Sequence, residues 1–163
     1  MKLSSLIDPR HVLVGDLSAS LDEAVQHALR HAEASYRSVL SYEQALLAIR
    51  ERVALGGTAL PGGVAIPHAR LPGYDDLLII PVCFREPLRT EQGLAVNIAW
   101  VVLLGSGSSG IYLKMLAGVA RIAGDKTLSA ALVGASSGHE FVQVLEKSGI
   151  EVEKSLRVED IMS

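Results

Sequence analysis

One histidine of this chain stands in a setting that suits nucleophilic chemistry. His68 ends a short apolar run that two glycines precede and an arginine follows, and the other four histidines have no comparable setting. A neutral imidazole is nucleophilic near pH 7, and the phosphoramidate that it forms is labile enough to pass the phosphoryl group onward. The run over residues 62–70, GGVAIPHAR, therefore makes His68 the candidate nucleophile of this chain; its plain alternative is a strand-end histidine bonded to a backbone carbonyl.

A phosphorylated histidine needs positioning and charge neutralisation around the phosphate more than bond-breaking machinery. We expect the backbone amides around Gly62, Gly63 and Ala69 to form an anion-binding nest. Arg70 is close to His68 in sequence, but Pro72-Gly73 follows it, so we interpret it as a surface arginine on a turn.

Short strands between helices must position these residues. The pattern predicts strands at 11–14, 58–60, 63–66, 77–84 and 96–104, and helices at 21–34, 42–53, 111–123, 127–133 and 137–147. Capping-box spacing, as in Ser41 to Gln44, marks the starts of the first, second and last helices. We therefore expect an α/β fold, a single layered domain with a mixed β-sheet flanked by helices. Pro81 predicts an edge strand or a bulge, and Trp100 is expected to help close the core.

Composition narrows the class of protein. A chain of 163 residues suits one domain with one core. The sequence has 15 basic and 18 acidic residues, and the basic residues are not clustered in a block. The charge pattern therefore gives no support for nucleic-acid binding. The single cysteine, Cys83, reads as a small buried hydrophobe and fits a cytoplasmic location. The apolar runs are far shorter than the ~20 residues that span a bilayer, so we expect the protein to be peripheral to a membrane at most.

Arg52, Thr58 and the run to His68, taken in order, resemble the enzyme IIA domains of the bacterial phosphoenolpyruvate-dependent phosphotransferase system. The resemblance is to the fructose/mannitol and nitrogen-regulatory (type 2) class. Its pattern passes from an arginine, through a threonine and a glycine-rich turn, to Ala-Ile-Pro-His. It continues through Leu113-Lys114-Met115-Leu116 and Asp125-Lys126 to Leu128 and Leu132. We predict a IIA-like phosphocarrier domain over residues 1–149.

The resemblance implies roles for individual residues. His68 would attack the phosphorus, and Arg52 would offer a planar donor fork to the phosphoryl oxygens. Arg52 has an alternative interpretation as a solvated last-turn residue that stabilises a helix C-terminus. Thr58 either bonds a nitrogen of His68 or fills a strand.

Two positions depart from the family pattern. Tyr112 stands where the family commonly has a second histidine, which contacts or orients the first. A tyrosine donates a hydrogen bond but carries no positive charge near neutral pH, so Tyr112 is either a phosphate donor or a half-buried helix residue. The Arg-Glu pair of the family fits Arg50-Glu51 by composition and Arg52 by ungapped spacing, and we choose Arg52.

The function implied by the resemblance is that of a phosphocarrier. His68 would accept a phosphoryl group from an HPr-type phosphocarrier protein. The domain would then pass it to a IIB domain, or act through its phosphorylation state on a regulated transporter or enzyme. No metal or other cofactor is expected. The alternative, motivated by Tyr112, is a IIA-fold binding module that carries no phosphate and regulates a transporter or enzyme by docking or by small-ligand binding.

The remaining sequence patterns give weaker indications of a functional site. His27 and His31 have metal-ligand spacing on a helix, but no glutamate follows His27 and Arg30 disfavours a cation, so we expect a solvated face. The loop 105–110 lacks the Gly-Lys-Ser/Thr ending of a nucleotide P-loop. Residues 150–163 are predicted to be a C-terminal tail. Within it, 157–163 resembles the opening of a CBS domain, with an ordinary terminal segment as the alternative.

Overall fold

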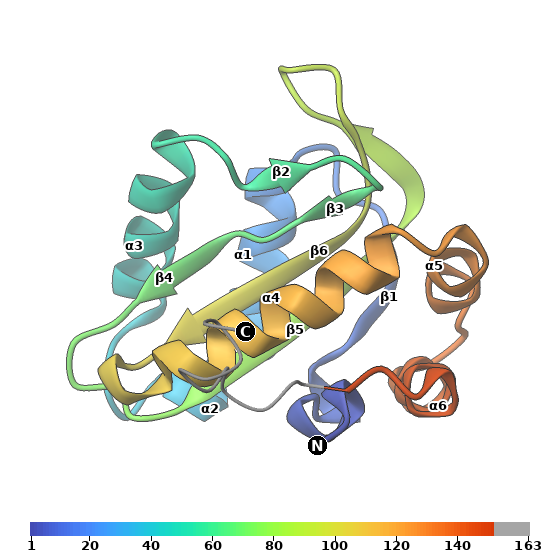
Figure 1. Cartoon of the computed structure of the whole chain (residues 1–163). Coiled ribbons are helices and arrows are strands. Elements are labelled where there is room, and N and C mark those ends of the chain that lie inside the picture. Colours follow the sequence, from blue (N-terminus) through green and yellow to red (C-terminus); the bar gives the residue numbers. More distant parts are fainter. Residues whose placement is uncertain (152–163) are drawn as a thin grey trace, which may run out of the picture.

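A six-stranded mixed sheet lies between two layers of helices in the part of the chain that the structure describes (Figure 1). The structure is a computed structural model, and it describes residues 1–151. The predicted layered α/β fold is confirmed. The CBS-like segment at 157–163 lies outside the described residues.

The long strands form the middle of the sheet. The strand order is β1-β5-β6-β3-β2, and β4 also pairs with β6. β5 and β6 are antiparallel, while β3 and β4 both run parallel to β6 along its other side. The strands are β1 (Leu13–Asp16), β2 (Ala59–Leu60), β3 (Val64–Ala65), β4 (His68–Arg70), β5 (Leu77–Arg89) and β6 (Ala95–Leu104).

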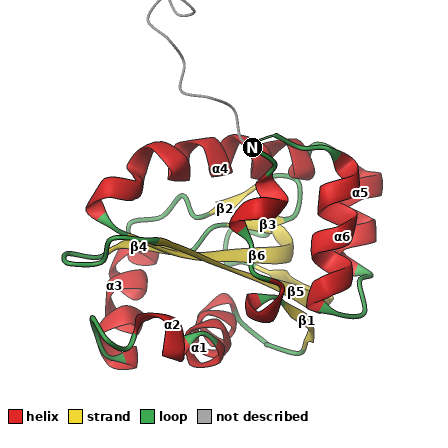
Figure 2. Ribbon diagram, turned by 90° about the horizontal axis from the view of Figure 1, so that it is seen from below, coloured by secondary structure: helices red, strands yellow, loops and turns green. Residues whose placement is uncertain are grey.

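The helices cover both faces of the sheet (Figure 2). One layer contains α1 (Leu21–His31), α2 (Glu33–Tyr36) and α3 (Tyr42–Ala54). The other contains α4 (Ser109–Ala123), α5 (Lys126–Val133) and α6 (Gly138–Ser148). Short 3-10 turns lie at η1 (Leu3–Leu6), η2 (Pro9–His11) and η3 (Ser106–Ser108). None of the helices in residues 1–151 combines the length and the apolar character needed to cross a membrane.

Serine caps fix the predicted helix starts. The hydroxyl of Ser41 accepts from the Gln44 amide, and the Gln44 side chain accepts from the Ser41 amide, which completes a capping box. The hydroxyls of Ser20 and Ser137 cap α1 and α6 by accepting from the amides of Glu23 and Glu140. The helix predicted to reach residue 34 ends at His31 instead, and α2 follows it after a break at Ala32.

The sheet separates two hydrophobic clusters, because successive side chains of a strand point to opposite faces. On β6, Val101 and Leu103 pack towards α1 and α3, whereas Trp100, Val102 and Leu104 pack towards α4 and α6. Trp100 is fully buried, and its ring lies 5.9 Å from that of Phe141. The central position predicted for this strand is therefore confirmed.

Pro81 needs a different explanation from the one that its sequence suggests. β5 is not an edge strand, because it lies between β1 and β6. Its ladder with β6 has a register shift between Cys83 and Leu88, and its ladder with β1 has one between the Leu13–Val82 and Asp16–Phe84 pairs, so Pro81 lies next to an irregularity rather than within it. The pairing with β1 begins only at Val82, so the missing N–H of residue 81 lies just outside that short ladder.

Candidate active site

His68 lies in a pocket where the end of the sheet meets α3 and α4. β4 places His68 and Arg70 there, the last turns of α3 supply Arg52, and α4 supplies Tyr112. In Figure 1 β4 lies beside α3, and α4 crosses the opposite face of the sheet from α3. The pocket has a volume of ≈ 320 Å³. Its lining is completed by Ala48, Glu51, Ala69 and Leu104.

The His68 ring is fixed by the backbone that precedes it. Its Nδ1 lies 2.7 Å from the carbonyl oxygen of Ile66, which can only accept a hydrogen bond, so Nδ1 carries a proton. Burial lowers the pKa of the half-buried His68 from 6.5; the hydrogen bond to Ile66 opposes this change, and the charges of Arg52 and Arg70 add to it. The ring is therefore neutral at pH 7. Its one proton is on Nδ1, and the lone pair is on Nε2.

Arg52 combines both roles that its sequence position suggested. Its Nη1 donates to the carbonyl oxygen of Gly56 at 2.9 Å, just beyond the end of α3, and the same side chain lines the His68 pocket. Arg50 is engaged elsewhere, in a two-bond ion pair with Asp22 on α1, with both N–O distances at 2.8 Å. Of these two arginines, the one chosen from ungapped spacing is the one beside His68.

Tyr112 packs against the imidazole. The two ring centroids are 5.2 Å apart with the planes tilted by 38°. Burial raises the pKa of Tyr112 to about 12, against the opposing charges of Arg52 and Arg70, so the phenol keeps its proton at neutral pH. Among residues 1–151 no group hydrogen-bonds its hydroxyl. Tyr112 is thus both a buried helix residue and a donor available at the pocket.

Arg70 is the residue that sequence analysis missed. It is the last residue of β4 rather than part of a turn, and it lines the pocket with His68. The signal was present in the spacing, because residues two apart on a strand share one face. Glu51, one residue before Arg52, also lines the pocket and was not singled out as a site residue.

The structure does not bring the two predicted glycines to His68. Gly62 and Gly63 turn the chain between β2 and β3, and four residues, which include strand β3, separate Gly63 from His68. A Cβ on Gly62 would lie 2.7 Å from the carbonyl oxygen of Ala123 at the end of α4. Their predicted part in phosphate binding does not fit this position, because strand β3 leads away from the turn towards His68.

Thr58 fits the second of its two interpretations, in which it fills the strand region rather than bonding His68, and Ala69 reaches the His68 pocket. Thr58 is buried beside β2, where its carbonyl oxygen accepts from the Ile66 amide at 2.7 Å, and it does not line the His68 pocket. Ala69 does line the pocket, but its backbone faces β6. Pro67 accepts from Val102, and the amide of Leu71 donates to Leu104, so the odd-numbered residues of this segment bond to β6. The outward amides of β4 are therefore those of residues 68 and 70.

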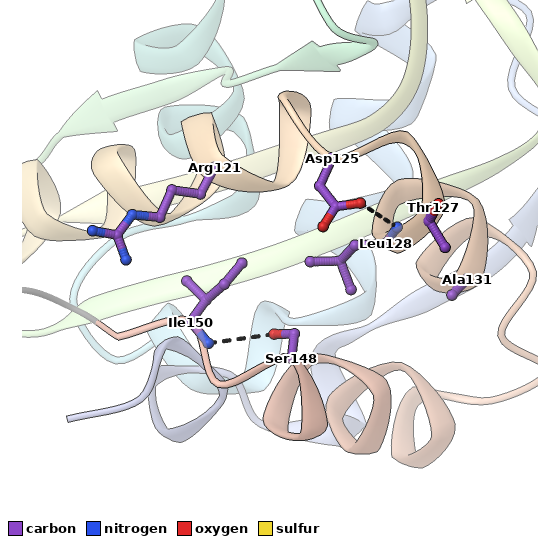
Figure 3. Close-up of a pocket in the computed structure, with 7 residues that line it drawn as sticks. All are labelled: Arg121, Asp125, Thr127, Leu128, Ala131, Ser148 and Ile150. Carbon is purple, nitrogen blue, oxygen red and sulfur yellow. Dashed lines mark hydrogen bonds between the residues drawn. The ribbon is translucent and has the colours of Figure 1, made fainter.

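A second hollow, of ≈ 390 Å³, lies between the end of α4, α5 and the end of α6 (Figure 3). Two of its polar side chains are engaged in local structure. Asp125 caps α5 by accepting from the Leu128 amide at 3.0 Å, and Ser148 accepts from the Ile150 amide at 3.4 Å. It contains no histidine, so it offers no counterpart to the His68 pocket.

The sequence model of the family described as "Phosphoenolpyruvate-dependent sugar phosphotransferase system, EIIA 2" matches residues 5–148. This chain belongs to the EIIA 2 family. The match covers every strand and helix that shapes the His68 pocket.

Two curated relatives show the range of this family. A nitrogen regulatory protein of Bradyrhizobium diazoefficiens is 28% identical to this chain over 148 residues. The match covers 89% of this chain and 95% of that protein. The EIIABC component specific for 2-O-alpha-mannosyl-D-glycerate of Escherichia coli is 25% identical over 154 residues. Here the match covers 91% of this chain but 23% of the relative.

Solved structures share the fold of the EIIA domain. The nitrogen regulatory protein IIA-Ntr from Neisseria meningitidis superposes with a TM-score of 0.73 at 24% identity, over 88% of this chain and 98% of that one. IIA mannitol from Escherichia coli superposes with a TM-score of 0.68 at 16% identity, over 85% and 98% of the two chains. At these identities the likeness establishes the fold alone.

Proposed function

We propose that this EIIA domain is a phosphocarrier that accepts a phosphoryl group on Nε2 of His68 from an HPr-type phosphocarrier protein. The observation that carries the proposal is the contact between His68 Nδ1 and the Ile66 carbonyl oxygen, 2.7 Å long. This bond fixes the tautomer and leaves the Nε2 lone pair to the pocket. Family membership supports phosphoryl transfer as the kind of chemistry that the pocket performs.

The transfer balances between two imidazoles. The Nε2 lone pair forms the new N–P bond while the N–P bond of the donor breaks, and the electron pair of that bond returns to the donor ring. A donor whose second ring nitrogen is protonated leaves as neutral imidazole. His68 takes over the corresponding form, with its Nδ1–H still donated to the Ile66 carbonyl oxygen. No other group has to gain or lose a proton.

Charge and hydrogen bonding in the pocket stabilise the transferred group. The Arg52 guanidinium supplies positive charge and several donors beside His68. The Tyr112 hydroxyl, which keeps its proton, donates to a phosphoryl oxygen. The transfer uses side chains alone and requires no metal or nucleotide.

Apolar side chains near the pocket suit a protein donor and a protein receiver. Ile111 and Leu113 flank Tyr112 in the sequence of α4, and Leu47 precedes the pocket residue Ala48 on α3; these three are 37%, 64% and 59% exposed. A solved complex joins enzyme IIAMTL to phosphorylated enzyme IIBMTL of Escherichia coli, and the IIA chain there shares this fold with a TM-score of 0.67. We propose a IIB domain, or a transporter or enzyme regulated by the phosphorylation state, as the receiver.

We propose the nitrogen-regulatory branch, which the 28% identity over 148 residues to the nitrogen regulatory protein of Bradyrhizobium diazoefficiens supports. We propose a cytoplasmic location, which a single free and buried thiol at Cys83 supports.

A mass measurement tests the proposed function. The chain is incubated with phosphoenolpyruvate, enzyme I and HPr-type carriers, and the gain of one phosphoryl group is followed. The label should appear on the wild type and on His139→Ala, which removes an exposed histidine of α6, and it should be absent from His68→Ala. Loss of the label in acid identifies a phosphoramidate. A His68→Ala variant that still takes the label would overturn the assignment.

The alternative function is a binding module that carries no phosphate. Tyr112 favours it, because this side chain packs against His68 and brings no charge to the place of the second family histidine. Absence of label from the wild type with several donors, in a chain that folds normally, would favour this alternative.

A further inference from the structure

Arg70 has a position that suits a contact with the phosphoryl group. β4 pairs in register with β6, with His68 opposite Val102 and Arg70 opposite Leu104. The side chains of residues 68 and 70 therefore leave the strand on the same face, and both line the pocket with Tyr112 of α4. The charge of Arg70 acts on His68 and also on Tyr112, which places the guanidinium near the two groups that would face the phosphate.

The guanidinium of Arg70 is also uncommitted. Within residues 1–151 no hydrogen bond or ion pair engages it, whereas Arg52 is bonded to the Gly56 carbonyl and Arg50 to Asp22. An exposed arginine without a partner can turn towards a new anion without breaking an existing contact.

The charge balance of the pocket requires a second cation. A phosphoryl group brings about −1.5 to −2 charges near neutral pH. Glu51 adds another negative charge to the lining, Tyr112 is neutral, and Arg52 offers a single positive charge. With Arg52 alone, the side chains of the unphosphorylated pocket cancel each other, and the incoming dianion would be left without compensation. Arg70 gives the pocket a net positive charge before the phosphate arrives.

We infer that Arg70 is a second phosphate-binding cation of the His68 site, and that it supplies the charge that Tyr112 cannot supply in the place of the second family histidine. This inference rests on the proposed phosphorylation of His68. Its structural basis is the i, i+2 placement of the two side chains on β4 and their shared pocket.

The test compares Arg70→Gln and Arg70→Lys with Arg85→Gln, a matched control on another exposed strand arginine, in β5. Phosphorylation is started with phosphorylated HPr-type protein and, separately, with the small donor phosphoramidate. We expect Arg70→Gln to slow the uptake of label at least about tenfold with both donors. Arg70→Lys should recover part of the rate, because it restores the charge but not the planar fork. Arg85→Gln should behave as the wild type.

An NMR titration of His68 in unphosphorylated protein gives an independent readout. Removal of the Arg70 charge should raise the pKa of His68, and Arg85→Gln should leave it unchanged. Equal rates for wild type and Arg70→Gln, with His68 labelled in both, would overturn the role of Arg70 and leave the phosphocarrier function standing. A defect confined to the protein donor would also overturn it, since Arg70 would then act in docking. A wild type that neither donor labels would overturn both proposals.

Discussion

His68 Nδ1 lies 2.7 Å from the carbonyl oxygen of Ile66, two residues earlier in the same chain. Pro67 separates the two residues, and its own carbonyl accepts from the Val102 amide of β6. The segment between β3 and β4 therefore fixes both the pairing of β4 with β6 and the tautomer of the His68 imidazole. The consequence is chemical, because it determines which ring nitrogen can attack a phosphoryl group.

His68 should still accept a phosphoryl group at pH values below the ordinary pKa of histidine. Burial is the main cause that holds the pKa of His68 below 6.5, and the two arginine charges act in the same direction. Only the neutral ring has the Nε2 lone pair, so activity should be complete at pH 7 and should fall as the pH passes down through the lowered pKa. The rate of phosphorylation between pH 5 and 8, compared with an NMR titration of His68, checks this. A shared midpoint above pH 6.5 would contradict the proposed environment.

Substitutions of Arg52 and of Arg50 should have different effects, although both residues lie on α3. Arg52→Gln removes a guanidinium that lines the His68 pocket and should lower the phosphorylation rate by about tenfold to a hundredfold. Arg50→Gln breaks the surface ion pair with Asp22, which should change the free energy of unfolding little and leave the rate unchanged. Initial rates and urea unfolding measure the two effects. Equal rates for the two variants would argue against a role for Arg52.

Tyr112→Phe isolates the hydroxyl from the ring. Phenylalanine keeps the packing against His68 but cannot donate to a phosphoryl oxygen. We expect the phosphorylation rate to fall roughly fivefold to tenfold, the equivalent of ~1–1.5 kcal/mol for one hydrogen bond. Thermal unfolding should be nearly unchanged, because no protein group in residues 1–151 bonds that hydroxyl. A phosphorylation rate equal to that of the wild type would make Tyr112 a packing residue only.

Gly62 should prove structural rather than functional. An added Cβ would meet Ala123 of α4 at 2.7 Å, whereas Gly57 has the same left-handed backbone with nothing within 4 Å. Gly62→Ala should therefore lower the free energy of unfolding by at least ~1–2 kcal/mol more than Gly57→Ala does. Urea unfolding of the two variants measures the difference. If a folded Gly62→Ala variant took up no phosphoryl label while Gly57→Ala did, the result would support a role of Gly62 in phosphate binding.

Local rules in the sequence were enough for most of the fold. The serine caps located the starts of α1, α3 and α6, and the long apolar run that contains Trp100 located the central strand. The predicted strand 63–66 corresponds to β3, and the separate strand β4 (His68–Arg70) that follows it was missed. It depends on Pro67 and on how β6 pairs with the chain on both sides of it, and that is a tertiary property.

The site was predicted in part, for a related reason. The sequence singled out His68, Arg52 and Tyr112, which the fold brings together from β4, α3 and α4. It placed Gly62 and Gly63 beside His68 because they are near in sequence, but an extended strand carries His68 away from that turn. It set Arg70 aside as a turn residue, although strand geometry places it on the same face as His68.

The identity of the phosphorylated atom tests the central claim most directly. The chain is labelled with ¹⁵N, phosphorylated, and examined by NMR for coupling between ³¹P and the ring nitrogens of His68. The account predicts coupling at Nε2 with Nδ1 still protonated against Ile66. Coupling at Nδ1, or a phosphoryl group on any other residue, would contradict it.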